Sequence, residues 1–325
     1  MFANLLGHDA IAERFRRMIA RGRLASTFLF VGPEGVGKRS FALGLGQALL
    51  CSRSENAELE ACGTCDNCQL VRAGNHPDLL TVACPAGKSS LPLELFIGPP
   101  EKRGQMGLCH DLSLRPYMGS RRIAVIDDAD LLGVECANAL LKTLEEPPPR
   151  SVLILIGTSL AKQLPTIRSR AQVVRFGALS TADVLSIAQA QRPETPAAEL
   201  AVLAERSGGA LSRLALAADE AWWSFRTQLI AYLSAGRRDA HKFAGLVEDF
   251  VNESGKDASE RRERMGQVLA GALEFFRDRV RGAAADPLSA EPLLANIDHC
   301  FEAEQALGRN VNLANLIPHW VGQLR

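Results

Sequence analysis

The sequence predicts an α/β fold in which a mostly parallel five-stranded sheet is covered on both faces by helices and is followed by all-helical regions. One observation behind this prediction is that five short apolar runs alternate with helical patterns up to residue 177. The other is that strand-like runs stop after Gly177, whereas apolar residues continue to recur at helical spacing. The predicted strands are residues 28–31, 79–82, 123–126, 152–156 and 173–176.

These patterns divide the chain into three predicted domains. Residues 1–177 form the sheet domain, residues 178–219 a small three-helix lid, and residues 220–325 a domain of long helices. The predicted helices are 9–21, 41–50 and 135–146 in the first domain, 181–191, 197–207 and 210–218 in the second, and 222–235, 258–282, 289–307 and 313–324 in the third.

Composition and charge exclude some classes of function. The chain has 325 residues, 47% of them apolar, and its 37 basic residues balance its 37 acidic ones. A balanced charge without a basic stripe predicts no tight DNA binding by the monomer, so any DNA contact would come from a local patch or through an assembly. The first residues lack the layout of a signal peptide, and no apolar run approaches the roughly 18 residues that span a bilayer. We therefore expect a cytoplasmic protein without a membrane partner.

The segment TFLFVGPEGVGKRS, residues 27–40, has the order of strand, glycine-rich turn and helix that a phosphate-binding loop requires. Gly32, Gly35 and Gly37 let backbone N–H groups face an anion, and Lys38 can reach the outer phosphates. The alternative is a chance glycine-rich turn, which the flanking strand and helix make the weaker explanation.

One position departs from the phosphate-loop pattern. The residue after the lysine is normally Ser or Thr, whose hydroxyl binds Mg²⁺, but here it is Arg39. Ser40 is displaced by one residue, or about 100° of helix rotation. ATP therefore remains a candidate ligand, but the missing hydroxyl argues against Mg²⁺-assisted hydrolysis.

Polar residues follow two of the predicted strands. Asp127 and Asp128 end the third strand, where one carboxylate can hold Mg²⁺ through water and the other can polarise an attacking water. Thr158 follows the fourth strand, where its hydroxyl can point at a γ-phosphate. Capping of a nearby helix or turn explains Asp128 and Thr158 equally well.

Cys51, Cys62, Cys65 and Cys68 form the spacing Cys-x10-Cys-x2-Cys-x2-Cys, which we predict to bind one structural Zn²⁺ within a module of about residues 51–68. Four thiolates leave no open position for catalysis. An iron–sulfur cluster is the alternative, but the closing Cys-x3-Cys-Pro of ferredoxin-type runs does not follow.

The stretch 84–106 is rich in Pro, Gly and Lys and has little periodicity, so it is expected to be a surface excursion. No role is predicted for residues 84–115.

Several motifs together resemble the bacterial clamp-loader subunits of the AAA+ superfamily over most of the chain. These motifs occur in the same order as in the family. They are the four-cysteine insertion, His76-Pro77-Asp78, the run ANALLKTLEEPP of residues 137–148, and Ser169-Arg170. The resemblance implies a zinc-bearing ATPase-like domain, a lid, and a helical collar through which five subunits form a ring. It also implies that Ser169 and Arg170 present an arginine finger to a neighbouring subunit. The alternative is that Arg170, like Arg168 and Arg175, is an ordinary surface charge.

Departures from the family pattern bear on function. Ala171 replaces a cysteine at little cost, whereas Arg39 and the offset position of Arg213, one residue from the expected sensor arginine, weaken a case for ATP turnover. They favour the non-motor delta prime type over the motor subunits gamma and tau, with weak or no ATPase activity of its own.

The expected function is assistance in loading the sliding clamp onto primed DNA within the DNA polymerase III holoenzyme. The expected partners are the gamma or tau and delta subunits in a hetero-pentameric ring, the clamp, and primer–template DNA through the assembly, near the nucleoid. The alternatives are an active gamma- or tau-like motor, distinguished by loss of turnover when Lys38 is changed, and a zinc-bearing DNA repair factor, distinguished by tight DNA binding of the monomer.

Overall fold

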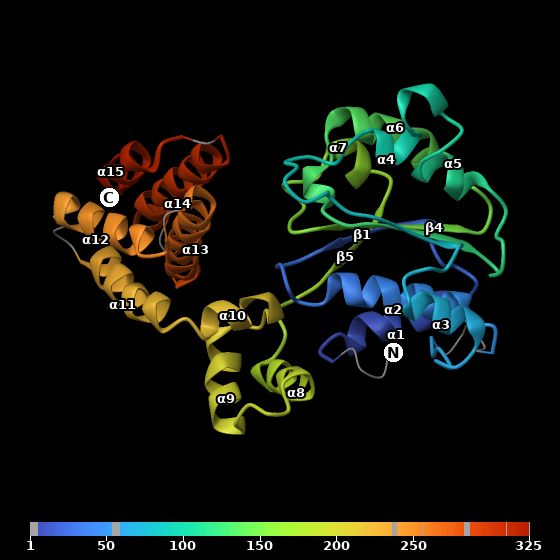
Figure 1. Cartoon of the computed structure of the whole chain (residues 1–325), viewed down its shortest axis with the longest axis horizontal. Helices are drawn as coiled ribbons and strands as arrows, with labels where there is room; N and C mark the ends of the chain where they lie inside the picture. The colour runs from blue at the N-terminus through green and yellow to red at the C-terminus, as the bar shows by residue number, and fades with distance from the viewer. Residues whose placement is uncertain are drawn as a thin grey trace. The chain divides into compact units, whose positions relative to one another are not determined.

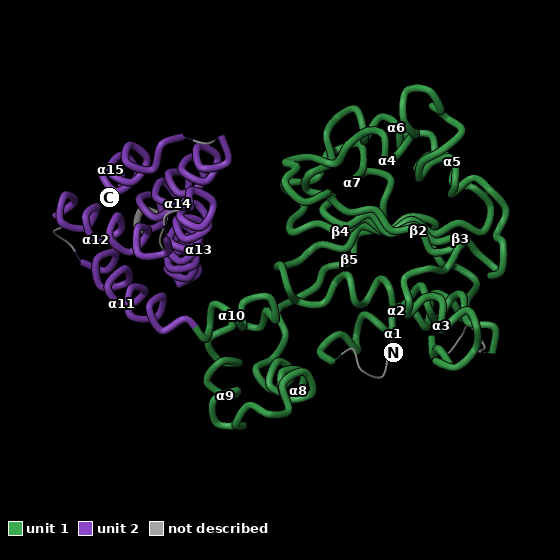
Figure 2. The backbone as a smooth tube through the Cα atoms, in the orientation of Figure 1, with its two compact units in different colours: residues 1–218 green, residues 219–325 purple. Residues whose placement is uncertain are grey.

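The computed structural model describes residues 6–53, 59–235, 239–255, 257–282, 287–309 and 311–324. Part of the predicted zinc module, residues 54–58, lies outside this set. The chain divides into two compact units, residues 1–218 and 219–325 (Figure 2). The lid and sheet residues fall in the same unit, so their separation into two domains remains a prediction.

The predicted parallel five-stranded sheet is confirmed. Its strand order is β2-β3-β4-β1-β5, and every neighbouring pair is parallel. The two strands that flank β4 are thus β3 and β1, so the chain segments that follow these three strands emerge side by side. The strands are β1 (Thr27–Val31), β2 (Leu79–Val82), β3 (Arg122–Ile126), β4 (Ser151–Gly157) and β5 (Gln172–Arg175).

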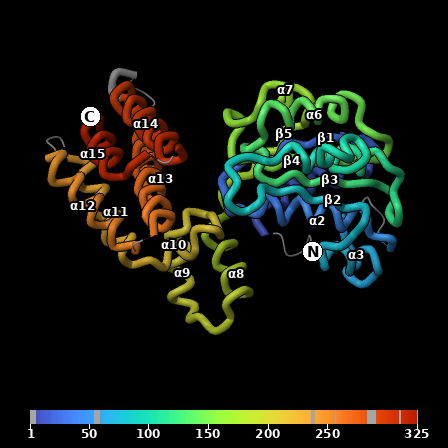
Figure 3. Tube along the Cα trace, turned by 45° about the horizontal axis from the view of Figure 1, so that its top comes forward, coloured from blue at the N-terminus to red at the C-terminus, as the bar shows by residue number. Residues whose placement is uncertain are grey.

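Apolar side chains alternate between the two faces of the sheet, because successive residues of a strand point in opposite directions. Phe28 and Phe30 of β1 pack on one face with Phe15 and Phe41, while Leu29 packs in a separate cluster on the other. In Figures 1 and 3, helices cover both faces of the sheet. The first face carries α1 (Asp9–Ala20), α2 (Lys38–Leu50) and α3 (Asp66–Arg72), and the second carries α4 (Glu94–Ile97), α5 (Leu108–Ser113), α6 (Val134–Glu145) and α7 (Pro165–Arg168).

The expectation of a surface excursion over 84–106 is correct only in part: residues 85–90 and 100–106 are exposed, but the middle of the segment packs into the core. Leu91 and Phe96 are 3% and 0% exposed and belong to the core cluster of the second face, as does Leu108 just after the segment. The segment folds as α4, a short 3-10 turn over Pro100–Lys102, and the start of the path to α5. Four-residue helices are too short to display a helical period, so the sequence pattern gave no sign of them.

The lid residues form a small core of their own. Val184 of α8 (Thr181–Gln191) and Leu200 of α9 (Ala197–Arg206) pack with Leu214 of α10 (Leu214–Ala217). The single third helix predicted over 210–218 is instead a 3-10 turn, Leu211–Arg213, followed by α10.

All regular elements among the described residues of the second unit are helices. One helix, α12, was not among those predicted, although Phe243, Val247 and Phe250 recur at helical spacing and Asp239 caps its first turn. None of the described helices of the chain has the length and apolarity needed to cross a membrane. The helices are α11 (Glu220–Ser234), α12 (Ala240–Asn252), α13 (Ala258–Gly282), α14 (Pro287–Gly308) and α15 (Leu313–Gln323).

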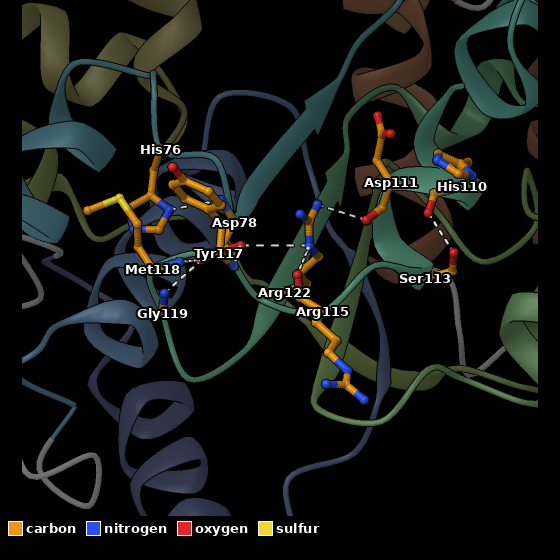
Figure 4. Close-up of polar contacts among 10 residues, drawn as sticks. All are labelled: His76, Asp78, His110, Asp111, Ser113, Arg115, Tyr117, Met118, Gly119 and Arg122. Atoms are coloured by element: carbon orange, nitrogen blue, oxygen red, sulfur yellow. Dashed lines mark hydrogen bonds and ion pairs between the residues drawn. The ribbon is translucent and has the colours of Figure 1, made fainter. Parts of the chain in front are cut away.

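A buried carboxylate ties β2 to the loop before β3 (Figure 4). Asp78 accepts hydrogen bonds from the backbone N–H groups of Tyr117, Met118 and Gly119 at 2.7–2.8 Å, and Arg122 lies 3.6 Å from it. Burial alone would raise the pKa of Asp78, but the three donors and the Arg122 charge outweigh it and hold the pKa below its usual value. The Nδ1 atom of His76 accepts from the Asp78 N–H, and burial lowers the pKa of His76, so its ring is neutral. The His-Pro-Asp motif therefore has a structural role.

Asp78→Asn should lower the free energy of unfolding by about 1–3 kcal/mol at neutral pH, because an amide cannot accept from three donors and Arg122 loses its partner. A carboxylate with a lowered pKa stabilises the fold above its unfolded pKa and ceases to do so as pH falls through the folded value. The difference in unfolding free energy between the unmutated chain and Asp78→Asn should therefore vanish in acid. Urea unfolding followed by circular dichroism measures it, with Asp111→Asn as control because only the Asp111 backbone carbonyl accepts from Arg122. Equal stability of the two variants would contradict this role.

Candidate phosphate-binding and metal sites

The phosphate loop lies between β1 and α2, as the sequence predicts. Gly35 and Gly37 have φ of +73° and +95°, values that side chains with a Cβ rarely adopt. Gly37 is the residue before α2, so the first N–H groups of a 13-residue helix face the loop. The buried ring of His8 supports the loop from outside, since its Nε2 donates to the Val36 carbonyl at 2.6 Å.

Lys38 is turned back onto its own loop. Its Nζ donates to the carbonyl oxygens of Gly32 at 2.7 Å and Pro33 at 2.5 Å, and the residue is 7% exposed. Burial lowers the pKa of Lys38, although the negative charges of Asp130, Glu34 and Asp127 oppose the shift. The ammonium group that would meet a phosphate already has two acceptors.

Arg39 occupies the surroundings in which a metal ion would be held. Its Nη1 donates to Asp127 Oδ2 at 2.8 Å, which joins the residue after the phosphate-loop lysine to the end of β3. The Arg39 side chain is 53% exposed and that of Asp127 21%. Ser40 lies on the exposed side of α2. The carboxylate predicted to hold Mg²⁺ thus faces a fixed positive charge.

The acidic residues beyond β3 also have internal partners. Asp128, at a left-handed φ of +53°, accepts from the Cys84 N–H at 3.1 Å. Asp130 accepts from the Thr158 backbone N–H at 3.0 Å, from the Thr158 hydroxyl and from Gln163. Thr158 is therefore directed at an acid of its own chain.

The lid contacts the tip of the phosphate loop. The N–H of Leu211 donates to the Gly35 carbonyl at 2.9 Å, and a Cβ at Gly35 would overlap the side chain of Ser212. Gly35 thus serves a close approach between two segments as well as a turn. The sequence singled out Gly35 for phosphate binding, and no local pattern reveals its contact with a residue far along the chain.

The predicted site residues fall into two groups. The phosphate loop, Asp127 and Thr158 follow β1, β3 and β4 and meet at the carboxyl edge of the sheet. Arg170 precedes β5, at the opposite edge, and is separated from the phosphate edge by a strand of four residues, or about 13 Å. There its guanidinium donates to Glu145 Oε1 at 2.6 Å and 3.1 Å and to the Ser169 hydroxyl at 3.1 Å.

The sequence motifs assigned no function to Asp130, Glu145, His8 or Gln163. Asp130 had a detectable signal, as the third acid within four residues of the β3 end. Glu145 lies in the run of residues 137–148 that resembles the clamp-loader family, but no role was predicted for it. The interactions of His8 and Gln163 are recognised only from contacts across the fold.

The four predicted cysteines come together. All four sulfur atoms lie within 4.8 Å of one another, with Cys51 and Cys65 at 3.9 Å and Cys62 and Cys68 at 4.0 Å. A tetrahedral zinc site with Zn–S bonds of about 2.3 Å requires Sγ–Sγ separations of about 3.8 Å. The donor set and its spacing therefore fit a tetrahedral metal ion such as zinc.

Backbone groups also favour charged sulfur at this cluster. The Cys62 N–H points at Cys51 Sγ and the Cys65 N–H at Cys62 Sγ, both at 3.4 Å. Burial raises the pKa of the Cys68 thiol to about 12, so a bound metal would have to displace its proton.

A glycine-rich loop between the first strand and a helix, with an acidic strand end beside it, is the arrangement of a phosphate-loop protein. The family comparison is more specific. The chain belongs to the family described as DNA polymerase III, delta subunit, whose model matches residues 7–180.

Curated relatives agree with this family. The delta' subunit of DNA polymerase III from Pseudomonas aeruginosa is 33% identical over 189 residues, which are 58% of this chain and 54% of that protein. The delta' subunit from Yersinia pestis is 29% identical over 80% of this chain and 74% of that protein. The tau subunit from Escherichia coli is 30% identical over 56% of this chain and 26% of that protein. The match thus spans about half the length of the Pseudomonas relative, and the resemblance to delta prime clamp-loader subunits is confirmed.

One of the solved structures that match this chain is a polymerase III gamma subunit-related protein from Thermotoga maritima. It has 16% sequence identity and a TM-score of 0.41, over 97% of this chain and 99% of that one.

Metal analysis of the purified chain should find about one zinc ion and no iron, because four thiolates close a tetrahedral site. Cys65→Ser should release the ion, while Cys84→Ser, outside the cluster, should retain it. The sheet should stay folded in both variants, since the cluster Cys51, Cys65 and Cys68 packs apart from the two sheet cores. Four freely titrating thiols without metal, or a visible iron–sulfur absorbance, would contradict the zinc assignment.

Proposed function

We propose that this chain is a non-motor subunit of the bacterial clamp loader, of the delta prime type, which assists the ATP-dependent loading of a sliding clamp onto primed DNA. The observation that carries the proposal is the ion pair between Arg39 and Asp127 at 2.8 Å. It puts a guanidinium beside the carboxylate that would help to hold Mg²⁺, in a chain that lacks the adjacent metal-binding hydroxyl.

Charge and geometry argue against hydrolysis by this chain. A guanidinium has no lone pair for a metal, and its charge repels a divalent cation nearby. The remaining groups of the site have other partners: Lys38 with loop carbonyls, Thr158 with Asp130, and Asp128 with the Cys84 N–H. Nucleotide binding is therefore weak or absent and depends little on Mg²⁺.

In this proposal Arg170 acts on a neighbouring subunit. Its place at the sheet edge away from its own phosphate loop supports action in trans, because its reach does not span a strand of about 13 Å and the loop beyond it. An arginine finger stabilises charge that develops on the transferred phosphoryl group. Arg170 keeps 34% of its side chain exposed for such a contact.

The partners follow from the same proposal. The helical residues 219–325 would form the collar of a five-membered ring with gamma or tau and delta subunits, and the ring would contact the clamp and primer–template DNA. Clamp loading would take place in the cytoplasm, at the nucleoid. A motor of the gamma or tau kind is the alternative, since relatives of that kind also match this chain. The repair-factor alternative has no support from the polymerase III family.

Arg170→Ala should reduce ATP hydrolysis by the neighbouring motor subunit about 10³-fold or more at that site, because an arginine finger contributes three to five powers of ten. The measurement is DNA- and clamp-stimulated hydrolysis by reconstituted rings in which the neighbour is the sole hydrolysing subunit. Melting temperature and ring assembly should hardly change.

Two controls separate this role from a local one. Lys38→Ala should leave the rate nearly unchanged, whereas the motor alternative requires that it fall. Arg168→Ala removes a nearby exposed arginine and should also have little effect. Full activity of the Arg170→Ala ring would refute the trans role and make Arg168 the next candidate.

A further inference from the structure

The guanidinium of Arg170 is held by an acid from another element. Its Nε and Nη2 atoms both donate to Glu145 Oε1, at 3.1 Å and 2.6 Å, and its Nη1 donates to Thr166 O at 3.2 Å and Ser169 Oγ at 3.1 Å. Among the described residues these bonds use four of the five guanidinium N–H groups. One N–H of Nη2 remains for an acceptor outside the chain.

The two elements that bear this pair are packed into the same core. Leu144, next to Glu145 at the end of α6, is 5% exposed, and Ile167 of α7, three residues before Arg170, is 1% exposed. Both belong to the apolar cluster on one face of the sheet. Glu145 therefore projects from a fixed support, which a positioning contact requires.

A contribution to fold stability does not explain the position of Glu145 beside Arg170. Its side chain is 52% exposed, and an ion pair with one half-exposed partner adds little to the folding free energy. Moreover, Glu145 and Glu146 stand at the carboxyl end of α6, where the helix dipole disfavours negative charge. An acid in an unfavourable place that meets a guanidinium through two nitrogens indicates a role in orienting that group.

We propose that Glu145 is a positioning residue for Arg170: it fixes the plane of the guanidinium so that its remaining N–H points at the nucleotide of the neighbouring subunit. This inference rests on the proposed action of Arg170 in trans. It also gives a task to the run of residues 137–148, whose acidic end the phosphate chemistry of this chain does not use. The buried leucines of the run anchor the helix, and its glutamate orients the finger.

The experiment uses the same reconstituted ring with a single hydrolysing neighbour. Glu145→Ala should lower kcat of that neighbour about 10- to 100-fold, since misplacement of a catalytic group by about 1 Å costs up to about a hundredfold. KM for ATP should stay within about twofold. The kcat measured with Glu145→Gln should lie between those of the unmutated ring and the Glu145→Ala ring, because the amide oxygen accepts a hydrogen bond but carries no charge. Glu146→Ala is the matched control, adjacent and exposed, and should be unaffected.

The double variant Glu145→Ala with Arg170→Ala should be no slower than Arg170→Ala alone, because Glu145 acts through Arg170. Unchanged or faster hydrolysis in both Glu145 variants, when Arg170→Ala alone is slow, would overturn the positioning role and leave the finger standing. If Arg170→Ala itself has no effect, the proposed function fails first. A rise in KM without loss of kcat would assign Glu145 to subunit or nucleotide binding and would also overturn the inference.

Discussion

The ion pair between Arg39 and Asp127 is the interaction on which the account of the phosphate loop depends. The strength of this ion pair would not by itself exclude Mg²⁺, because a pair with a half-exposed arginine contributes no more than about 1 kcal/mol. What matters is its charge. A site for Mg²⁺ needs anionic and neutral oxygen ligands, and here the hydroxyl is absent and the carboxylate is already beside a cation. The proposal that this loop does not hold Mg²⁺ is based on these two features.

The parallel sheet separates two kinds of chemistry. Its carboxyl edge gathers the phosphate loop, Asp127 and Thr158, all of them engaged within the chain. Its amino edge presents Arg170 on a rigid support with Glu145. Because the strands are buried, the two edges remain apart, and Arg170 lies away from the phosphate loop of its own chain. The proposed action of Arg170 on a neighbouring subunit is based on this separation.

Much of the fold was predictable because local sequence patterns specify its strands and motifs. Strands β1, β3 and β4 contain continuous apolar runs of four or five residues, and the phosphate loop and the cysteine cluster are defined by spacing within a few tens of residues. The short helices α4 and α5 were not predictable, since four to six residues cannot display a helical period. α12 was missed although its signal was present.

The candidate site was predictable in its residue types and not in their pairing. Arg39 and Asp127 were each identified, but they are 88 positions apart and only the fold brings them together. The same holds for Gly35 with Leu211 and for Arg170 with Glu145. Pairs of this kind depend on strand order and helix packing, which local periodicity does not specify.

The most direct test of this account is a calorimetric titration of the purified, metal-loaded chain with ATP, with and without Mg²⁺. The account predicts weak or undetectable binding that Mg²⁺ does not strengthen, together with no steady turnover by the lone chain. Tight binding that requires Mg²⁺, accompanied by hydrolysis, would contradict it and assign the chain to the motor subunits.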